Sequence, residues 1–367
     1  ALALLLSVAA GLSSIAEPVD RIIESAVGAV AWRPVSGDIV VVALDDRTIE
    51  KYGRDDFSVR RHAQVIDAID RAGAKRLFVD FTYERRRNDR DLPLLTDAVK
   101  RMHDRIILAA STKWVRGTTA ELANVPGPGF GNEVQTGVIG WEFAFWQVWR
   151  IPAAVMVDGR IDPSFSAMMA DFHPQKASVY ALDYSYNVNS IPTYSAADVL
   201  AGKIGKRELA GKDVIFAPTA ESFQDIHYLP GKDRVPGAYI HIVGAETLKR
   251  GIPFDIGWAP AFLLAVIALI AALSRRQTRW FNIAVVTTVS ALIIGKLVLM
   301  TMLISSSIGA ALFFVATVSA NVSRSRRRRS AQRENPLSGL PNFEALRTQQ
   351  SFGSATVIAA KVINFED

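Results

Sequence analysis

Five polar residues that follow apolar, strand-like runs could form a binding site. They are Asp45, Asp46, Asp80, Thr219 and Glu221. The carboxyl ends of parallel strands meet at one edge of a sheet, so we expect these side chains to converge on an acidic crevice that binds a cation, an amine or a sugar. The alternative is structural: Asp45 or Asp46 caps the next helix, and Asp80 accepts hydrogen bonds from loop amides. The structural interpretation is preferred.

No other pattern in the sequence indicates catalysis or a metal site. There is no phosphate loop of the Walker type, and the glycine-rich stretch 127–131 lacks the preceding strand and the downstream acid of a dinucleotide site. No serine lies in a nucleophile elbow. His62 and His241 have no second ligand at a matching spacing, which favours hydrogen-bonded structural histidines. We therefore expect no catalytic residue, metal ligand or cofactor in this chain.

Alternating strand and helix patterns between residues 37 and 250 position the candidate residues. The first part predicts strand, helix, strand, helix and strand over 38–44, 59–72, 76–81, 92–102 and 105–110. Later strands are predicted at 153–157 and 213–217, and later helices at 164–172, 195–202 and 237–250. The valine-rich run 38–44 is typical of a strand buried on both faces. The order predicts a mostly parallel α/β sheet with helices on both faces, interrupted by a loop-rich insertion or irregular lobe at 112–152.

The composition indicates apolar segments beside an ordinary globular part. Half of the residues are hydrophobic and 21% are charged, and the apolar residues are unevenly distributed. The net charge of +6 comes mostly from one arginine cluster near the C-terminus, so we expect no nucleic-acid partner. The sequence has no cysteine, which excludes disulfides and thiolate metal sites.

Four apolar segments have the composition of membrane spans: 1–16, 257–274, 280–300 and 303–323. About twenty helical residues cross a hydrocarbon core, which places a tight turn near 300–305. We expect the first segment to be the end of a truncated span. A signal peptide is the alternative, and either one would export the residues after it. Lys296 is the single charge within 281–322, and we expect its side chain to snorkel towards the outer turn rather than to function inside the membrane.

Two basic loops fix the orientation of these segments, because cytoplasmic flanks carry the excess of lysine and arginine. The first loop contains Arg275, Arg276 and Arg279. The second, the linker 324–334, contains six arginines, among them Arg324, Arg326, Arg327, Arg328 and Arg329. Two spans separate the loops, so both lie in the cytoplasm. Residues 17–256 then lie outside, which predicts a multi-pass inner-membrane protein with a periplasmic domain.

Three motifs in the exported region resemble the second class of CHASE domains, the extracellular sensor modules of bacterial signalling proteins. They are IVVVALDD at 39–46 followed by Arg61 and His62, AGAKRLFVD at 72–80, and VPGAYIH at 235–241 followed by ETLKRG at 246–251. The family also places three membrane spans directly after this domain. The resemblance covers residues 20–330 and implies a sensor over 17–256 with an unknown ligand or protein partner. One departure is DDFSVR at 55–60, where the family commonly has a turn rich in tryptophan and proline.

The last segment, 335–367, resembles the start of a GGDEF domain, a family that makes cyclic di-GMP from GTP or has lost that activity. NPLSGLPN at 335–342 is similar to the entry motif of the family. In the family the first strand ends in an aspartate that holds magnesium. Here the aligned residue is Lys361, and Phe365 fixes the register. An ammonium group cannot ligate Mg²⁺, so the resemblance implies a degenerate domain. The alternative is an alignment in which Glu366 or Asp367 supplies the carboxylate.

These observations predict a bacterial inner-membrane receptor. A class-two CHASE domain lies outside, four spans cross the lipid, and a degenerate GGDEF domain precedes an EAL phosphodiesterase that turns over cyclic di-GMP. Magnesium and GTP or cyclic di-GMP are expected only for that cytoplasmic part, and a homodimer is expected. The first alternative is an active diguanylate cyclase receptor. The second is a non-enzymatic scaffold that binds a protein through the aromatic residues Trp141, Phe143, Phe145 and Trp146.

Overall fold

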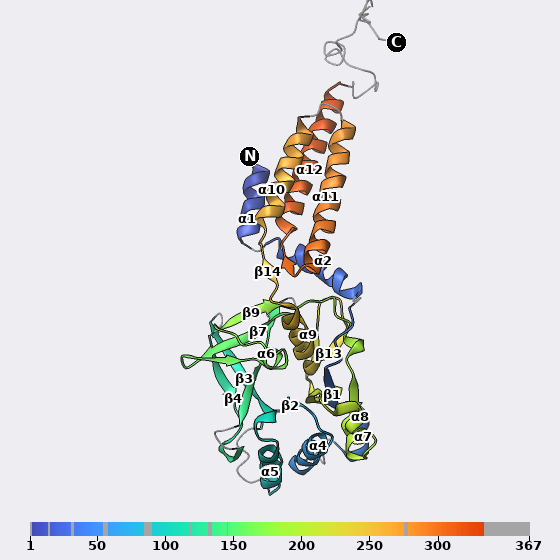
Figure 1. Cartoon of the computed structure of the whole chain (residues 1–367). Coiled ribbons are helices and arrows are strands. Elements are labelled where there is room, and N and C mark those ends of the chain that lie inside the picture. Colours follow the sequence, from blue (N-terminus) through green and yellow to red (C-terminus); the bar gives the residue numbers. More distant parts are fainter. Residues whose placement is uncertain are drawn as a thin grey trace, which may run out of the picture. The chain divides into compact units, whose positions relative to one another are not determined.

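The structure is a computed structural model that describes residues 2–13, 15–30, 33–53, 58–83, 90–116, 119–130, 134–144, 146–274 and 278–333. The chain divides into two compact units, whose elements are labelled in Figure 1. The α/β unit comprises Glu17–Gly257 and Ile293–Ile308. The helical unit comprises the residues up to Ala16, Trp258–Leu292 and the residues from Gly309 on.

The α/β unit is built on one large sheet. Among the described residues it has eleven strands, in the order β10-β1-β11-β2-β3-β4-β7-β6, with β5 beside β3 and with β8 and β9 beside β7. The strands that pair in parallel over several residues are β1 (Ile39–Leu44), β2 (Arg76–Val79), β3 (Ile106–Arg116), β5 (Gln135–Ile139), β10 (Thr193–Ser195) and β11 (Asp213–Pro218). Every residue of β1 and β11 is buried, as expected for parallel strands covered on both faces. The prediction of a mostly parallel α/β sheet is confirmed.

Helices cover both faces of this sheet, as predicted (Figure 1). One face carries α4 (Val59–Arg71), α5 (Leu92–Met102) and α7 (Ala196–Leu200), and the other carries α6 (Phe165–Met169) and α9 (Gly237–Arg250). Successive side chains of a strand point to opposite faces. In β1, Val40 and Val42 therefore join the core under α4, whereas Val41 and Ala43 join the core under α9.

The stretch 112–152 is not loop-rich, and that prediction is wrong. Strand β3 runs on to Arg116 and is followed by β4 (Thr119–Asn124), β5, β6 (Glu142–Ala144) and β7 (Gln147–Val157). Strand β7 pairs antiparallel with β6, β8 (Arg160–Pro163) and β9 (Ser178–Ala181). The run Pro126-Gly-Pro-Gly129 lies in the connection between β4 and β5. The prediction extended this turn signal too far, because the strands on either side are stabilised by pairing with other strands of the sheet.

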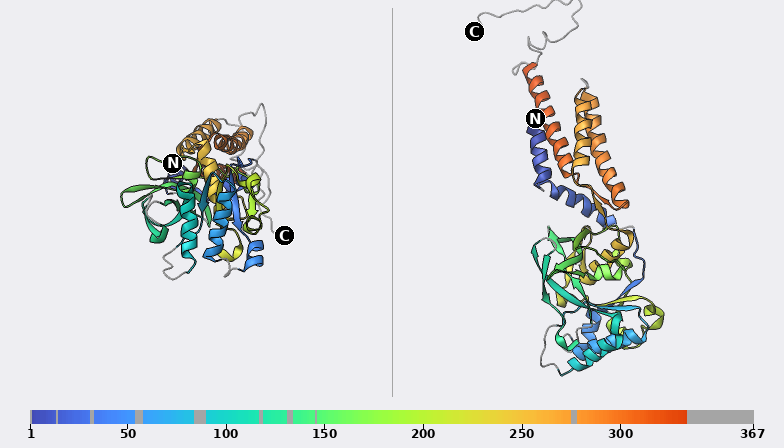
Figure 2. Two further views of the ribbon diagram at one scale, coloured as in Figure 1. Left: turned by 60° about the horizontal axis from the view of Figure 1, so that its bottom comes forward. Right: turned by 60° about the vertical axis from the view of Figure 1, so that its left-hand side comes forward.

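The helical unit contains α1 (Leu2–Leu12), α10 (Ala259–Leu273), the first part of α11 (Thr278–Thr301) and the last described helix, α12 (Gly309–Arg333). Figure 2 shows α1 beside α12, and α12 also contacts α10. The rings of Phe262 and Phe314 meet edge to face with centroids 5.4 Å apart. A Cβ atom on Gly11 would lie 2.6 Å from Cδ2 of Trp258, so only glycine permits this close approach.

One helix of the described residues, α11, is long and apolar enough to cross a membrane by itself. Helix α1 and the next helix, α2 (Glu17–Val30), meet the same criterion only together, as a pair bent by 64°. Helix α10 is apolar but has 15 residues. The apolar segment predicted at 303–323 becomes helical only at Gly309, because β15 (Ile304–Ser305) first pairs with β14 (Phe254–Asp255). Helix α12 then continues through the arginine cluster, where the sequence predicts a linker.

Lys296 does not snorkel, contrary to the prediction. Its side chain is 2% exposed, and Nζ lies 3.0 Å from Oε1 of Glu24, 3.4 Å from Oδ1 of Asp20 and 2.6 Å from the carbonyl oxygen of Ser306. Asp20 also accepts hydrogen bonds from the hydroxyl of Ser307 and the amide of Ile308. We call Asp20, Glu24, Lys296, Ser306 and Ser307 the Lys296 cluster. All of these residues belong to the α/β unit, where α2 brings two carboxylates to the end of α11.

Candidate functional site

The carboxyl ends of three parallel strands, β1, β11 and β2, meet at one edge of the sheet. Strand β11 lies between β1 and β2, with Leu44 opposite Pro218 and Val79 opposite Phe216, and β3 follows β2. Asp45, Asp80 and Thr219, which each come next after one of these strands, are therefore placed along the same edge, as the sequence predicts for them.

Asp45 caps a helix at this edge. It is the N-cap of α3 (Asp46–Tyr52), and its Oδ1 accepts hydrogen bonds from Thr48 N at 2.9 Å, Thr48 Oγ1 at 2.5 Å and Ser195 Oγ at 2.8 Å. Asp46 is the first residue of the helix and is exposed. These contacts correspond to the structural alternative that the sequence left open for the Asp45–Asp46 pair.

Thr219 contacts the strand-end edge through its backbone amide, whereas Glu221 lies on the surface in an ion pair. The amide of Thr219 donates to the carbonyl oxygen of Leu44 at 3.0 Å, which ties the end of β11 to the end of β1. The side chain of Glu221 is 70% exposed, and its Oε1 accepts a hydrogen bond from Nη1 of Arg234 at 2.9 Å. Within the described residues, Asp45 and Glu221 thus each have partners of their own, a helix cap and an ion pair.

Asp80 differs from the other candidates because it is buried and no described residue donates a hydrogen bond to its carboxyl group. The residue is 8% exposed. Burial, and secondly the nearby charge of Asp225, raise the pKa of Asp80 well above its usual value. A carboxyl group in this environment is a candidate for a functional residue, because strongly perturbed acids are concentrated at sites.

Two histidines and a tryptophan accompany Asp225. His227 Nε2 and Asp225 Oδ1 lie 2.9 Å apart, and the His227 ring meets the edge of Trp141 with centroids 4.6 Å apart. Trp141 also contacts the ring of His241, at 5.3 Å between centroids. A Cβ atom on Gly237 would lie 2.6 Å from Asp225 Oδ2, so this glycine leaves room for the carboxylate. We call Asp80, Trp141, Asp225, His227 and His241 the edge cluster.

His241 is the second perturbed group of the edge cluster. It lies on α9, is 2% exposed, and its Nε2 has no hydrogen-bond partner among the described residues. Burial lowers the pKa of His241 to about 4, with a smaller upward effect of Asp225 and a further downward effect of His227. The prediction of a hydrogen-bonded structural histidine is wrong for Nε2 of His241. It is confirmed for His62, whose Nδ1 lies 2.7 Å from the hydroxyl of Tyr83.

Asp225 and His227 are not among the site residues that the sequence predicts. Asp225 directly precedes β12 (Ile226–Tyr228), and His227 lies within this strand, which pairs with β13 (Arg234–Pro236). Their alternate spacing is that of side chains on one face of a strand. That alternation was a readable signal, although nothing local connects it to Asp80 or His241. In the part of the chain that the structure describes, no group of three or more His, Asp or Glu residues could hold a metal ion.

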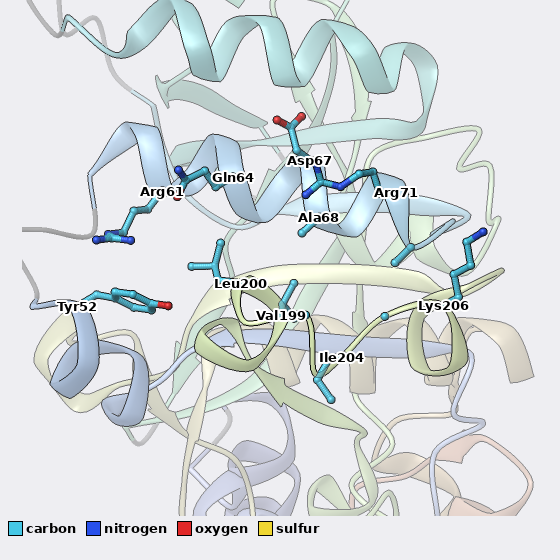
Figure 3. Close-up of a pocket in the computed structure, with 13 residues that line it drawn as sticks. Tyr52, Arg61, Gln64, Asp67, Ala68, Arg71, Val199, Leu200, Ile204 and Lys206 are labelled. Atoms are coloured by element: carbon cyan, nitrogen blue, oxygen red, sulfur yellow. The ribbon is translucent and has the colours of Figure 1, made fainter.

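A cavity of about 640 Å³ lies apart from the edge cluster, between α4 and the segment 199–206 (Figure 3). Tyr52, Arg61, Gln64 and Asp67 form part of its lining, together with Arg71 and Lys206. Its volume is in the range typical of small-molecule sites.

The predicted aromatic partner surface is only partly described. Trp146 is 89% exposed and has a positive φ of 63°, whereas Trp141 packs against the two histidines of the edge cluster. The side chains of Phe143 and Phe145 lie outside the described residues.

The predicted orienting arginines lie mainly on α12. Arg324, Arg326, Arg327, Arg328 and Arg329 belong to this helix. The guanidinium of Arg326 lies 5.1 Å from the ring centroid of Phe281, and that of Arg279 lies 5.5 Å from the ring of Trp280. Arg275, Arg276 and Lys361 lie outside the described residues.

Comparison with known proteins assigns the greater part of the chain. The family model described as "CHASE2 domain" matches residues 2–274. The match spans α1, the edge cluster and α10. No curated protein and no solved structure shows a significant match.

Proposed function

The chain belongs to the CHASE2 domain family, whose members are extracellular sensor domains, and on this premise we propose that it is the sensing part of a transmembrane receptor. The observation that carries the proposal is the extent of the family match. It covers the whole of the sheet and both sequence neighbours of the α/β unit, α1 and α10. The apolar helix α11 and the arginine-rich end of α12 come later in the chain.

The proposed topology places residues 17–256 in the periplasm and residues 275–279 and 324–367 in the cytoplasm of a bacterial inner membrane. The four spans are 1–16 and the segments around α10, α11 and α12. Arginine excess on both basic segments supports this orientation. Two copies of the chain would form a symmetric homodimer in the membrane, because symmetric dimers are the commonest homo-oligomers.

Reporter fusions test the topology. We expect alkaline phosphatase to be active when it is fused after Lys232 and inactive after Gln332, and a cytoplasmic fluorescent reporter to show the opposite pattern. The physical reason is that the arginines before Gln332 resist translocation. Equal behaviour of either reporter at the two sites would contradict the proposal.

The proposed output is cyclic-di-GMP turnover. The resemblance of 335–342 to a GGDEF entry motif supports it, and Lys361 in place of a magnesium ligand supports a degenerate domain that regulates an EAL phosphodiesterase in the full-length protein. Magnesium, GTP and cyclic di-GMP would bind that cytoplasmic part. An active diguanylate cyclase remains the alternative if Glu366 or Asp367 supplies the carboxylate, and a scaffold that binds a protein partner is a further one.

An assay of the purified full-length protein separates these outputs. With GTP and Mg²⁺ we expect no cyclic di-GMP, because a lysine at position 361 repels the metal ion, and with cyclic di-GMP we expect hydrolysis. Product formation from GTP that Lys361→Ala leaves unchanged would favour the cyclase. The absence of both reactions would favour the scaffold.

A further inference from the structure

The cavity beside α4 has two different walls. One wall is α4, from which Arg61, Asp67 and Arg71 project, and the other is the end of α7 with the segment that leads into α8 (Lys206–Leu209). Figure 3 shows Tyr52 and Arg61 at one end of the cavity and Lys206 at the other. Side chains from three separate parts of the sequence therefore converge on this cavity.

The charge of the lining is positive. Asp67 is its one carboxylate among the described residues, and it is already engaged by Arg101, a residue outside the lining, whose Nη2 lies 2.6 Å and 2.9 Å from the two carboxylate oxygens. Arg71 and Lys206 form no ion pair with any residue of the described chain, and no hydrogen bond of their side chains is present there. Two cations thus face the cavity without a counter-charge.

The floor of the cavity is apolar. Val199 is buried, and Leu200, Ile204 and Ala68 are half-buried along the lining. At one end the guanidinium of Arg61 lies 4.3 Å from the ring centroid of Tyr52. A bare inorganic anion would leave this apolar surface in water, whereas a ligand with an apolar body would cover it.

We propose that this cavity binds a small organic anion, a carboxylate or phosphate ester with an apolar body. Arg71 and Lys206 neutralise the negative charge from opposite walls, and Leu200 and Ile204 pack against the body. A cationic ligand would meet uncompensated like charge. The proposal rests on the proposed sensing function in one respect: it treats the bound anion as the signal. Binding itself does not depend on any signalling output.

Binding of phenyl phosphate to the purified full-length protein, measured by calorimetry at low salt, tests this assignment. We expect saturable binding that is tighter than that of inorganic phosphate or of the uncharged benzyl alcohol. Arg71→Gln and Lys206→Gln should each weaken it by at least about tenfold, the loss expected for one charged hydrogen bond. Arg207→Gln is the matched control, because Arg207 is adjacent in sequence but pairs with Glu208 at 3.0 Å outside the lining.

Two results would overturn the proposal. One is no saturable binding of phenyl phosphate, and the other is equal affinity in the wild type and all three variants. If inorganic phosphate binds as tightly as phenyl phosphate, the proposed contact between the apolar lining and the body of the ligand is wrong. None of these results affects the reporter topology or the family assignment, so failure of this proposal is distinguishable from failure of the sensing role.

Discussion

Lys296→Met should lower the free energy of unfolding of the α/β unit by about 3–5 kcal/mol, the cost of removing the cation from the buried carboxylate of Asp20. Glu24 retains its ion pair with Arg21. Lys296 is 2% exposed and Asp20 is 5% exposed, so water cannot replace the lost partner. Methionine fills a similar volume, which confines the change to charge and hydrogen bonding. Unfolding of the purified full-length protein in detergent, followed by tryptophan fluorescence, measures the loss.

Two further variants isolate the cause. Lys100→Met removes an exposed lysine of α5 and should change stability by less than about 0.5 kcal/mol. Adding Asp20→Asn to Lys296→Met should restore part of the stability, because the unpaired charge is then gone. A loss below about 1 kcal/mol for Lys296→Met would show that the cluster is hydrated and contributes little.

The Lys296 cluster lies where the chain enters the α/β unit and where it returns to it. Helix α2 is where the chain enters the α/β unit after Ala16, and residues 293–308 are where it returns to that unit from α11. The cluster links these two passages, and the guanidinium of Arg21 on α2 also lies 4.3 Å from the ring centroid of Trp149 in β7. We therefore expect Lys296→Met to alter the coupling between sensor and output as well as stability.

His241→Gln and Asp80→Asn should change the pH dependence of stability in opposite directions. In the folded protein His241 has a pKa of about 4 against a usual 6.5, so between these values the unfolded chain binds the extra proton. Stability contributed by neutral His241 is therefore lost as pH falls from 6.5 to 4, by roughly 3 kcal/mol in all.

The contribution of Asp80 to stability changes with pH in the opposite direction. Its folded pKa is raised well above the usual 3.8, so the folded protein keeps the proton longer, and stability falls as pH rises from 3.8 through the raised pKa. In the wild type the two contributions therefore have opposite signs. Relative to the wild type, stability should rise less with increasing pH between 4 and 6.5 in His241→Gln, and it should rise more above pH 3.8 in Asp80→Asn.

Chemical unfolding of the full-length protein at several pH values measures these slopes, so an overall loss of stability in either variant does not affect the comparison. Asp225 and His227 face both groups and are retained in both variants. His103→Gln is the control, because the side chain of His103 is 80% exposed. The edge cluster would not be a coupled titrating site if both variants kept the wild-type slope.

The sequence by itself determined the elements and their burial in the parallel half of the fold. The valine-rich run 38–44 and the helical spacing of 59–72 are local patterns, and each became the expected strand or helix because burial repeats with the period of the element. The same kind of pattern supported the strand-end placement of Asp45, Asp80 and Thr219. The pattern did not distinguish the roles of the two acids, Asp45 as a hydrogen-bonded helix cap and Asp80 as a buried acid. A cap depends on residues close in the sequence, whereas burial depends on packing against distant ones.

Only the tertiary structure decided the rest. The strands of 112–152 are held by pairing within the large sheet, partly with segments outside this stretch, so its turn-forming residues misled the prediction. The edge cluster joins residues from β2, β12 and α9, and the Lys296 cluster joins α2 to the end of α11 across more than 270 positions. The physical reason is the same in each case. The energy of a buried charge depends on the groups that lie within a few ångströms of it. The fold brings those groups together, and residues adjacent in the sequence do not determine them.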